Sequence, residues 1–121
     1  MEARLTSLID RVRAAKRVYI IGNGGSAANA MHIANDLVSC GIRAHALTAD
    51  IATFSAIAND YGYENVFSRQ IEVFGESDDL LIALSGSGQS TNILKSIDTS
   101  QDIGMSIWRF LGNERGENMQ V

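Results

Sequence analysis

Two short segments rich in glycine and serine carry the residues best suited to chemistry in this sequence. They are GNGGSA, at residues 22–27, and SGSGQS, at residues 85–90. Each segment follows a short apolar run and precedes a helical pattern, which places it between a strand and a helix. A helix N-terminus offers free backbone N–H groups and a partial positive charge, and both suit a phosphate. The two segments therefore predict a site for a small anion.

The second segment adds side-chain hydroxyl groups to this backbone site. Ser85, Ser87 and Ser90 place three hydroxyls around a loop that Gly86 and Gly88 make conformationally permissive. Three hydroxyls at this spacing form a plausible cradle for the three oxygens of a phosphate. A simpler interpretation is that serine and glycine only make turns and caps. Two such loops, both at strand ends, favour binding.

The first segment allows a different ligand when it is considered alone. Gly22, Gly24 and Ala27 match the G-x-G-x-x-A pattern of dinucleotide sites, and Asp50 ends the next strand, where a ribose-binding carboxylate would lie. The serine-rich second loop argues against a dinucleotide, because such a site does not require a phosphate cradle after its third strand. The glycines would then serve a close approach of ligand to backbone, and Asn23 would add a side-chain donor, as would Ser26.

One helix face after the first segment could hold a metal. His32 and Asp36 lie four residues apart and share a polar sector with Asn29, so they are neighbours on the helix surface. We expect the opposite side to face the sheet; it carries Ala30, Ala34, Leu37 and Val38. Two ligands make a weak zinc site, so a hydrogen-bonded interface histidine is the alternative interpretation of His32. His45, on a predicted strand, is interpreted as structural.

Short apolar strands alternate with helical segments along the whole chain, which indicates βαβ units and a parallel sheet with helices on both faces. We expect one α/β domain over residues 1–121, with about four strands and with Ser26 as the N-cap of the second helix. The predicted strands cover residues 17–22, 44–49, 78–85 and 105–112, and the predicted helices cover residues 2–15, 26–39, 50–60, 63–74 and 91–98.

The composition narrows the classes of partner and the compartment. The net charge is −4, which argues against nucleic acid and anionic membranes as partners. Cys40 is the single cysteine, so no internal disulfide can form, and a reducing cytoplasm is expected. The charged N-terminal residues do not resemble a signal peptide, and no apolar run is long enough to cross a bilayer.

The two loops together resemble those of the sugar isomerase (SIS) domain family, and more closely those of its phosphoheptose isomerase branch. The motifs that carry the resemblance are GNGGSAANAMH, LTAD, AIANDYGYENVFSRQIE, DDLLIALSGSGQSTNILKSI and GMSI. The resemblance implies a flavodoxin-like three-layer αβα fold, a homotetramer, a sugar phosphate bound between subunits, and a place in heptose or lipopolysaccharide biosynthesis.

The same resemblance implies roles for individual residues. Ser85, Ser87 and Ser90, with Gly86, would hold the phosphate, and His32 and Asp36 would bind zinc and carry the acid–base chemistry. Aspartate stands at position 36 where the catalytic branch has a glutamate, and the family's C-terminal glutamine and histidine are not in this sequence. The residues expected to contact the sugar are Asn23, Gly24, Gly25, Ser26, Asn59 and Asp60.

Two functions of different classes follow from these observations. The first is an aldose–ketose isomerase of phosphorylated heptoses such as sedoheptulose 7-phosphate, or a shortened version of one. The second is a non-catalytic SIS module that binds a sugar phosphate or a protein partner; a dinucleotide-binding domain ranks behind both. We expect a homo-oligomer, a dimer or tetramer, and weak or absent turnover by the chain as given.

Overall fold

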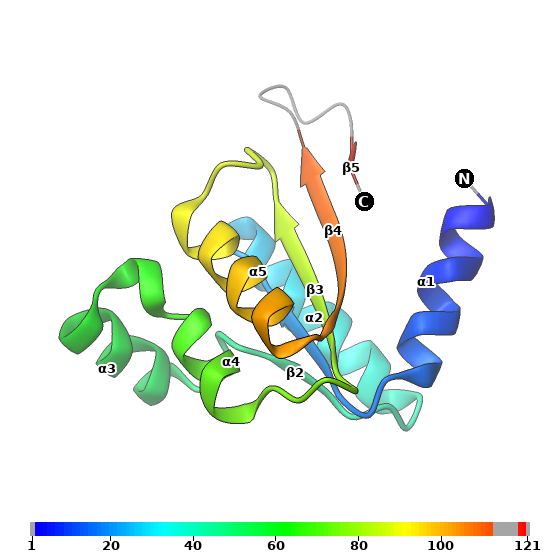
Figure 1. Ribbon diagram of the computed structural model, residues 1–121, viewed down its shortest axis with the longest axis horizontal. Coiled ribbons are helices and arrows are strands. Elements are labelled where there is room, and N and C mark those ends of the chain that lie inside the picture. Colours follow the sequence, from blue (N-terminus) through cyan, green and yellow to red (C-terminus); the bar gives the residue numbers. More distant parts are fainter. Residues whose placement is uncertain (1, 113–118, 121) are drawn as a thin grey trace.

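A five-stranded sheet forms the centre of the fold in the computed structural model, which describes residues 2–112 and 119–120 (Figure 1). The strand order is β2–β1–β3–β4–β5; the first four strands are parallel, and β5 is antiparallel to β4. This confirms the predicted parallel sheet and adds one short strand at its edge. The strands are β1 (Val18–Ile21), β2 (Ala44–Ala46), β3 (Leu80–Ser85), β4 (Ser106–Gly112) and β5 (Met119–Gln120).

Helices cover both faces of the sheet, giving the predicted three-layer α/β fold (Figure 1). Alternate residues of β1 enter two separate cores: Val18 and Ile20 pack toward α1 and α2, whereas Tyr19 and Ile21 pack toward α3, α4 and α5. A strand buried on both faces must be apolar throughout, which explains the run VYII. The helices are α1 (Glu2–Ala14), α2 (Gly25–Ser39), α3 (Ile51–Tyr61), α4 (Ser68–Phe74) and α5 (Thr91–Ile103), with a 3₁₀ turn η1 (Tyr63–Asn65).

The start of α2 differs from the sequence-based expectation. Ser26 is inside the helix, and the N-cap is Gly24, whose φ of 54° is a left-handed conformation that glycine adopts without strain. No side chain caps this helix. The prediction of Ser26 as N-cap is therefore wrong, because the turn uses glycine geometry instead of a serine hydroxyl.

The last turns of α5 also differ, since the helix runs to Ile103 instead of ending near residue 98. The residues after Ile97 are mostly polar, so the sequence does not show that this part of the helix is packed. In the structure Ser96 and Ser100 are both buried, and Ile103 packs against the core. Gly104, with φ 90°, then ends the helix in a left-handed C-cap.

The second βα connection has a shorter strand than predicted, and it has a helix cap that was not predicted. Strand β2 ends at Ala46 instead of residue 49, and Asp50 caps α3 by accepting a hydrogen bond from the Thr53 backbone N–H at 3.2 Å. The predicted helix over residues 63–74 is split into η1 and α4. These differences lie at element boundaries and leave the topology as expected.

Helix α1 lies along the edge of the molecule next to β4 (Figure 1). Arg11 fixes its C-terminal half by donating a hydrogen bond to the carbonyl of Ile107 at 3.0 Å and by stacking over Trp108, 5.2 Å from the ring centroid. Val12 is buried, but Leu5 and Ile9 remain 57% and 41% exposed. Leu5 and Ile9, which lie on the same face of α1 as Val12, are thus left uncovered by the described residues. No helix of the described residues has the length and apolar character needed to cross a membrane.

Candidate functional site

The serine loop lies where the sequence predicts, between the carboxyl end of β3 and the start of α5. Ser85 is buried, and its Oγ accepts a hydrogen bond from the Gly88 N–H at 3.1 Å. The Oγ of Ser87 accepts from the Gln89 N–H at 3.1 Å and lies 3.5 Å from the Oγ of Ser90. Gly88, with φ 71°, makes the turn that brings these hydroxyls together.

Helix α5 begins without a side-chain cap, although Ser90 occupies the N-cap position. The first N–H groups of a helix have no partner within the helix and need an acceptor from elsewhere. A bound anion supplies such acceptors and is favoured by the helix dipole. The loop and the helix start therefore have the geometry of an anion site.

The glycine loop at the carboxyl end of β1 approaches its helix closely. A Cβ atom at Gly22 would lie 2.6 Å from the backbone oxygen of Ser26, so a larger residue would displace the start of α2. Gly24 and Gly25 are exposed, with nothing close to the position of a Cβ, so their backbone is open to a ligand. This open backbone leaves room for the close approach of a ligand that the sequence predicts.

A pair of amide side chains joins the two loops. Asn23 Nδ2 donates to Asn92 Oδ1 at 2.9 Å, and Asn92 Nδ2 donates back to Asn23 Oδ1 at 2.8 Å. Tyr63 donates its hydroxyl proton to the same Asn23 oxygen at 3.0 Å. Sequence reasoning missed Asn92 and Tyr63, although both lie inside motifs that carry the family resemblance. Asn92 stands two residues after the serine loop, which was the available signal.

Two hollows flank the serine loop, and each is lined by some of the predicted site residues. One hollow, of about 370 Å³, brings Ser26 and His32 of α2 next to Ser85 and Gly86, and Phe110 forms part of its apolar wall. The glycine segment, the serine loop and His32 therefore meet in one concave region. The other hollow, of about 600 Å³, is lined by Asn23, Tyr63, Glu64, Ser90, Thr91 and Asn92.

His32 and Asp36 share one face of α2, as predicted, with 3.5 Å between Nε2 and Oδ2. Their side chains are 76% and 64% exposed, so the pair is open to a ligand or to another chain. Only His32 lines the hollow beside the serine loop. Among residues 2–112 and 119–120, no group of three or more histidine, cysteine, aspartate or glutamate side chains could hold a metal ion. A zinc ion bound by His32 and Asp36 would need further ligands, since two are fewer than protein zinc sites use.

The opposite side of α2 follows the prediction with one exception. Ala30 and Ala34 are buried against the sheet, and Leu37 is partly buried. Val38, expected to face the sheet, is 56% exposed. It lies near the helix end, where it borders a hollow that it shares with Ala44 and His45 of β2.

Asn59 and Asp60 lie near the C-terminus of α3, exposed, with Asn59 Nδ2 donating to Asp60 Oδ1 at 3.0 Å. They line neither of the hollows beside the serine loop. Within one chain, the structure does not bring these two predicted sugar contacts to the two loops.

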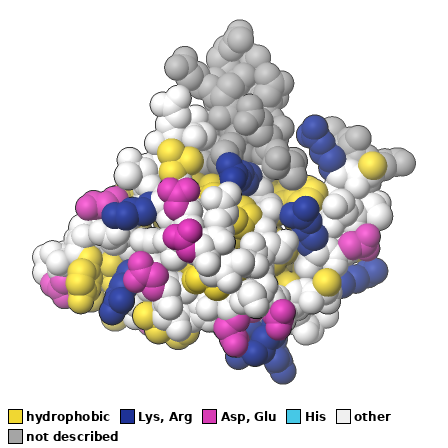
Figure 2. Space-filling view, viewed as in Figure 1, with side chains coloured by type: hydrophobic (Ala, Val, Ile, Leu, Met, Phe, Trp, Pro, Cys, Tyr) yellow, Lys and Arg dark blue, Asp and Glu magenta, His cyan; other side chains and the backbone are white. Residues whose placement is uncertain are grey.

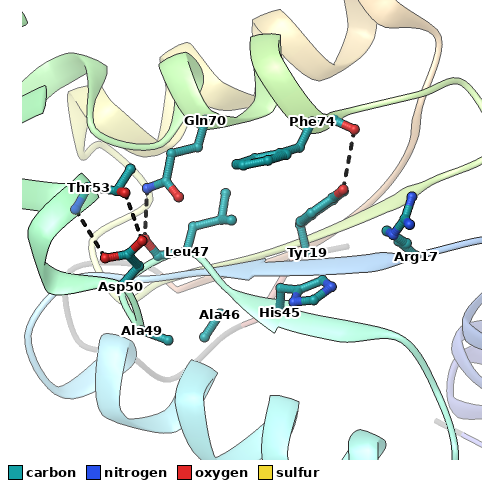
Figure 3. A pocket seen from close by; sticks show the side chains of 10 residues that line it. All are labelled: Arg17, Tyr19, His45, Ala46, Leu47, Ala49, Asp50, Thr53, Gln70 and Phe74. Carbon is teal, nitrogen blue, oxygen red and sulfur yellow. Dashed lines mark hydrogen bonds between the residues drawn. The ribbon is translucent and has the colours of Figure 1, made fainter.

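A third hollow lies apart from the loops, between β1, β2, α3 and α4 (Figure 3). Figure 3 shows Asp50 at one end, next to Thr53, and Arg17 at the other end, beyond Tyr19. Hydrogen bonds from Thr53 lower the pKa of the Asp50 carboxyl below its usual range, because they favour the ionised form. Asp50 is thus engaged as a helix cap, which weakens its proposed use for a ribose. His45 stacks on Tyr19 with 5.9 Å between ring centroids, the structural role expected for it.

Charged side chains are intermixed on the face shown in Figure 2, where acidic and basic groups alternate over the surface. A nucleic-acid site draws on clustered lysine and arginine. No large patch of basic side chains is visible among the described residues on this face.

The model of the SIS domain family matches residues 1–111. Two phosphoheptose isomerases show the similarity in sequence. That of Helicobacter pylori (strain P12) is 40% identical over 116 residues, which cover 91% of this chain and 60% of the relative. That of Burkholderia pseudomallei (strain K96243) is 47% identical over 111 residues, covering 87% and 56%. The chain thus spans up to 60% of the length of these curated relatives.

A solved structure agrees with the sequence comparison. The phosphoheptose isomerase of Neisseria gonorrhoeae superposes with a TM-score of 0.78 at 36% identity, covering 84% of this chain and 55% of that one. The family model covers most of the chain, and the strand–loop–helix geometry of both glycine–serine segments accompanies it. The chain therefore belongs to the SIS domain family.

Proposed function

We propose that this chain binds a phosphorylated sugar across its two glycine–serine loops. The observation that carries the proposal is the juxtaposition of the loops: they lie at the carboxyl ends of neighbouring parallel strands and are tied by the Asn23–Asn92 pair. The hydroxyls of the serine loop and the uncapped start of α5 would hold the phosphate. Gly24, Gly25 and Ser26 would face the sugar.

We further propose aldose–ketose isomerisation of sedoheptulose 7-phosphate as the reaction to which this site belongs. Support comes from the relatives, which are named phosphoheptose isomerases. The reaction moves a proton between C1 and C2 of the open-chain sugar through an enediol. Asp36 would take the proton as general base, and His32 would donate a hydrogen bond to the carbonyl oxygen, where negative charge develops.

A second candidate is a non-catalytic sugar-phosphate-binding module. One observation favours it: Asp36, the proposed base, lies outside the hollow that contains His32 and the serine loop. A general base must come within hydrogen-bond reach of the proton that it removes. On this candidate the loops bind the ligand and no proton transfer follows.

Zinc, a homo-oligomer and a cytoplasmic location complete the proposal, and each rests mainly on the family resemblance. His32 and Asp36 would provide two zinc ligands. Zinc titration of the wild-type chain and of His32→Ala would test the pair. The exposed apolar residues Leu5 and Ile9 on α1 support association between copies. The free, exposed Cys40 suits a reducing compartment.

Calorimetry and a turnover assay with sedoheptulose 7-phosphate would separate these functions. Binding together with turnover supports the isomerase, whereas binding without turnover, with or without added zinc, leaves the binding module. Inorganic phosphate serves as a second probe for the serine loop alone. If neither sedoheptulose 7-phosphate nor inorganic phosphate binds, the sugar-phosphate proposal is rejected.

A further inference from the structure

Three segments that are distant in sequence meet at one oxygen atom, the Oδ1 of Asn23. Asn23 belongs to the glycine loop, Asn92 to the first turn of α5, and Tyr63 to the 3₁₀ turn η1. The oxygen accepts hydrogen bonds from Asn92 Nδ2 at 2.8 Å and from the Tyr63 hydroxyl at 3.0 Å. A carbonyl oxygen has two lone pairs, so this acceptor is saturated by protein groups.

The remaining atoms of the pair are engaged as well. Asn23 Nδ2 donates to Asn92 Oδ1 at 2.9 Å, and the Asn92 side chain belongs to a residue only 3% exposed. Asn23 therefore offers a sugar only the second N–H of its Nδ2, since its oxygen is fully used by protein groups. Its bonds run to the protein, and they connect the glycine loop with the serine loop.

We propose that Asn92 and Tyr63 are positioning residues, which hold Asn23 and thereby set the spacing between the two glycine–serine loops. The inference rests on the proposed function, because the spacing matters for a ligand that touches both loops. A sugar phosphate would do so, whereas inorganic phosphate would touch only the serine loop. We call the three hydrogen bonds among Asn23, Asn92 and Tyr63 the clamp. Loss of the clamp should thus change the affinities for the two ligands unequally.

The geometry explains why three bonds are needed. The glycine loop contains the left-handed Gly24 and the exposed Gly25, and α2 has no side-chain cap, so the loop's own residues constrain it weakly. Packing of Tyr63 against Phe54, with 5.8 Å between ring centroids, holds the hydroxyl in place. Asn92 is held by its position in α5. Asn92 is thus fixed by burial, and Tyr63, although 51% exposed, is fixed by its contact with Phe54.

Two substitutions of minimal size change the clamp. Tyr63→Phe removes one hydroxyl and keeps the aromatic packing. Asn92→Asp keeps the acceptor for Asn23 Nδ2 but places a carboxylate oxygen against Asn23 Oδ1, where a donor is required. Matched controls are Tyr61→Phe and Asn35→Asp, which make the same chemical changes at exposed positions outside the clamp.

The readout is the ratio of two dissociation constants, that for sedoheptulose 7-phosphate and that for inorganic phosphate, measured by calorimetry. We expect each clamp variant to weaken the binding of sedoheptulose 7-phosphate about tenfold more than the binding of inorganic phosphate. A change of about tenfold corresponds to one net hydrogen bond. The controls should leave the ratio unchanged. Equal weakening of both ligands would indicate a merely structural role and overturn the inference, as would an unchanged ratio.

Amide hydrogen exchange tests the clamp without any ligand. Asn92→Asp changes a residue of α5, yet it should speed exchange at the backbone N–H groups of residues 24–26 in the other loop. Unchanged exchange there would overturn the inference. If the wild-type chain binds neither ligand but its glycine loop loosens in Asn92→Asp, the clamp stands and the proposed function fails.

Discussion

Asn23 and Asn92 exchange two side-chain hydrogen bonds of 2.9 and 2.8 Å across 69 residues of sequence. The bonds form because β1 and β3 are adjacent and parallel, which brings the segments after their carboxyl ends to the same edge of the sheet. The pair holds the two turns next to each other, so that they form one continuous surface. A ligand that bridges the turns meets a prearranged site and loses less conformational freedom on the protein's side.

Ser87→Ala should weaken the binding of sedoheptulose 7-phosphate. The Ser87 hydroxyl lies 3.5 Å from that of Ser90 and accepts the Gln89 N–H, so it both shapes the loop and faces the proposed phosphate. A hydrogen bond to a charged group contributes about 1.5–3 kcal/mol, which corresponds to a loss of roughly 10- to 100-fold in affinity. Calorimetry would measure it, with the exposed Ser77→Ala as control. Equal affinities in wild type and Ser87→Ala would show that the phosphate does not bind at this loop.

Asp36→Asn should separate binding from chemistry if the chain is an isomerase. The amide cannot accept the C1 or C2 proton, and positioned proton transfer accounts for about 10²–10⁴-fold in rate. Asp36 lies outside the hollow beside the serine loop, so sugar-phosphate affinity should remain close to that of wild type. Turnover and calorimetric titration of the same preparation would check both expectations. Full turnover in Asp36→Asn would assign the base to another residue.

Much of the fold was predictable because its signals are local. Strand β1 is apolar, as is β3 up to Ser85, and both lead into glycine–serine turns. Both the parallel sheet and the position of the two loops therefore followed from sequence order. Boundaries were harder to predict where buried polar residues interrupt the pattern. Ser96 and Ser100 are buried in α5 but look like surface residues in the sequence.

The candidate site was predictable only in part, for a similar reason. Single turns predicted the serine loop, whereas the clamp needs three segments whose meeting point only the tertiary structure reveals. The i, i+4 rule placed His32 beside Asp36, but it could not show that only His32 reaches the hollow. For Asn59 and Asp60 the resemblance predicts contacts with the sugar. Within one chain, however, the structure does not bring these residues to the two loops.

Substitution of Leu5 and Ile9 by lysine should reduce self-association. Both side chains lie on one face of α1 and are 57% and 41% exposed, and an apolar stripe of this kind is stabilised when another surface covers it. Light scattering of the wild-type chain should give a multiple of 13.1 kDa, and the double variant should shift toward the monomer. Ser7→Lys, on another face of the same helix, controls for the added charge. A wild-type monomer at micromolar concentration would contradict the prediction.

Stability should fall above about pH 10 because of Tyr19. The residue is 4% exposed, and its hydroxyl donates to the carbonyl of Phe74 at 3.3 Å. Burial, followed by the negative charge of Asp79, raises the pKa of this phenol above its ordinary value of 10.0. Below pH 10, Tyr19 is protonated in the folded and unfolded states, so it adds no pH dependence. Above that pH the unfolded chain releases the proton while the folded chain retains it, and unfolding is favoured as pH rises.

Tyr19→Phe isolates this effect, because the other two tyrosines, Tyr61 and Tyr63, are exposed and stay in both proteins. At pH 8 the variant should be less stable by about 0.5–1.5 kcal/mol, through loss of the hydrogen bond to Phe74. Urea unfolding at pH 8, 9.5 and 10.5 should then show the wild type losing stability more steeply, so the gap between the two proteins narrows. Parallel losses in both proteins would mean that the Tyr19 phenol titrates alike in the folded and unfolded states, and the proposed burial effect would be wrong.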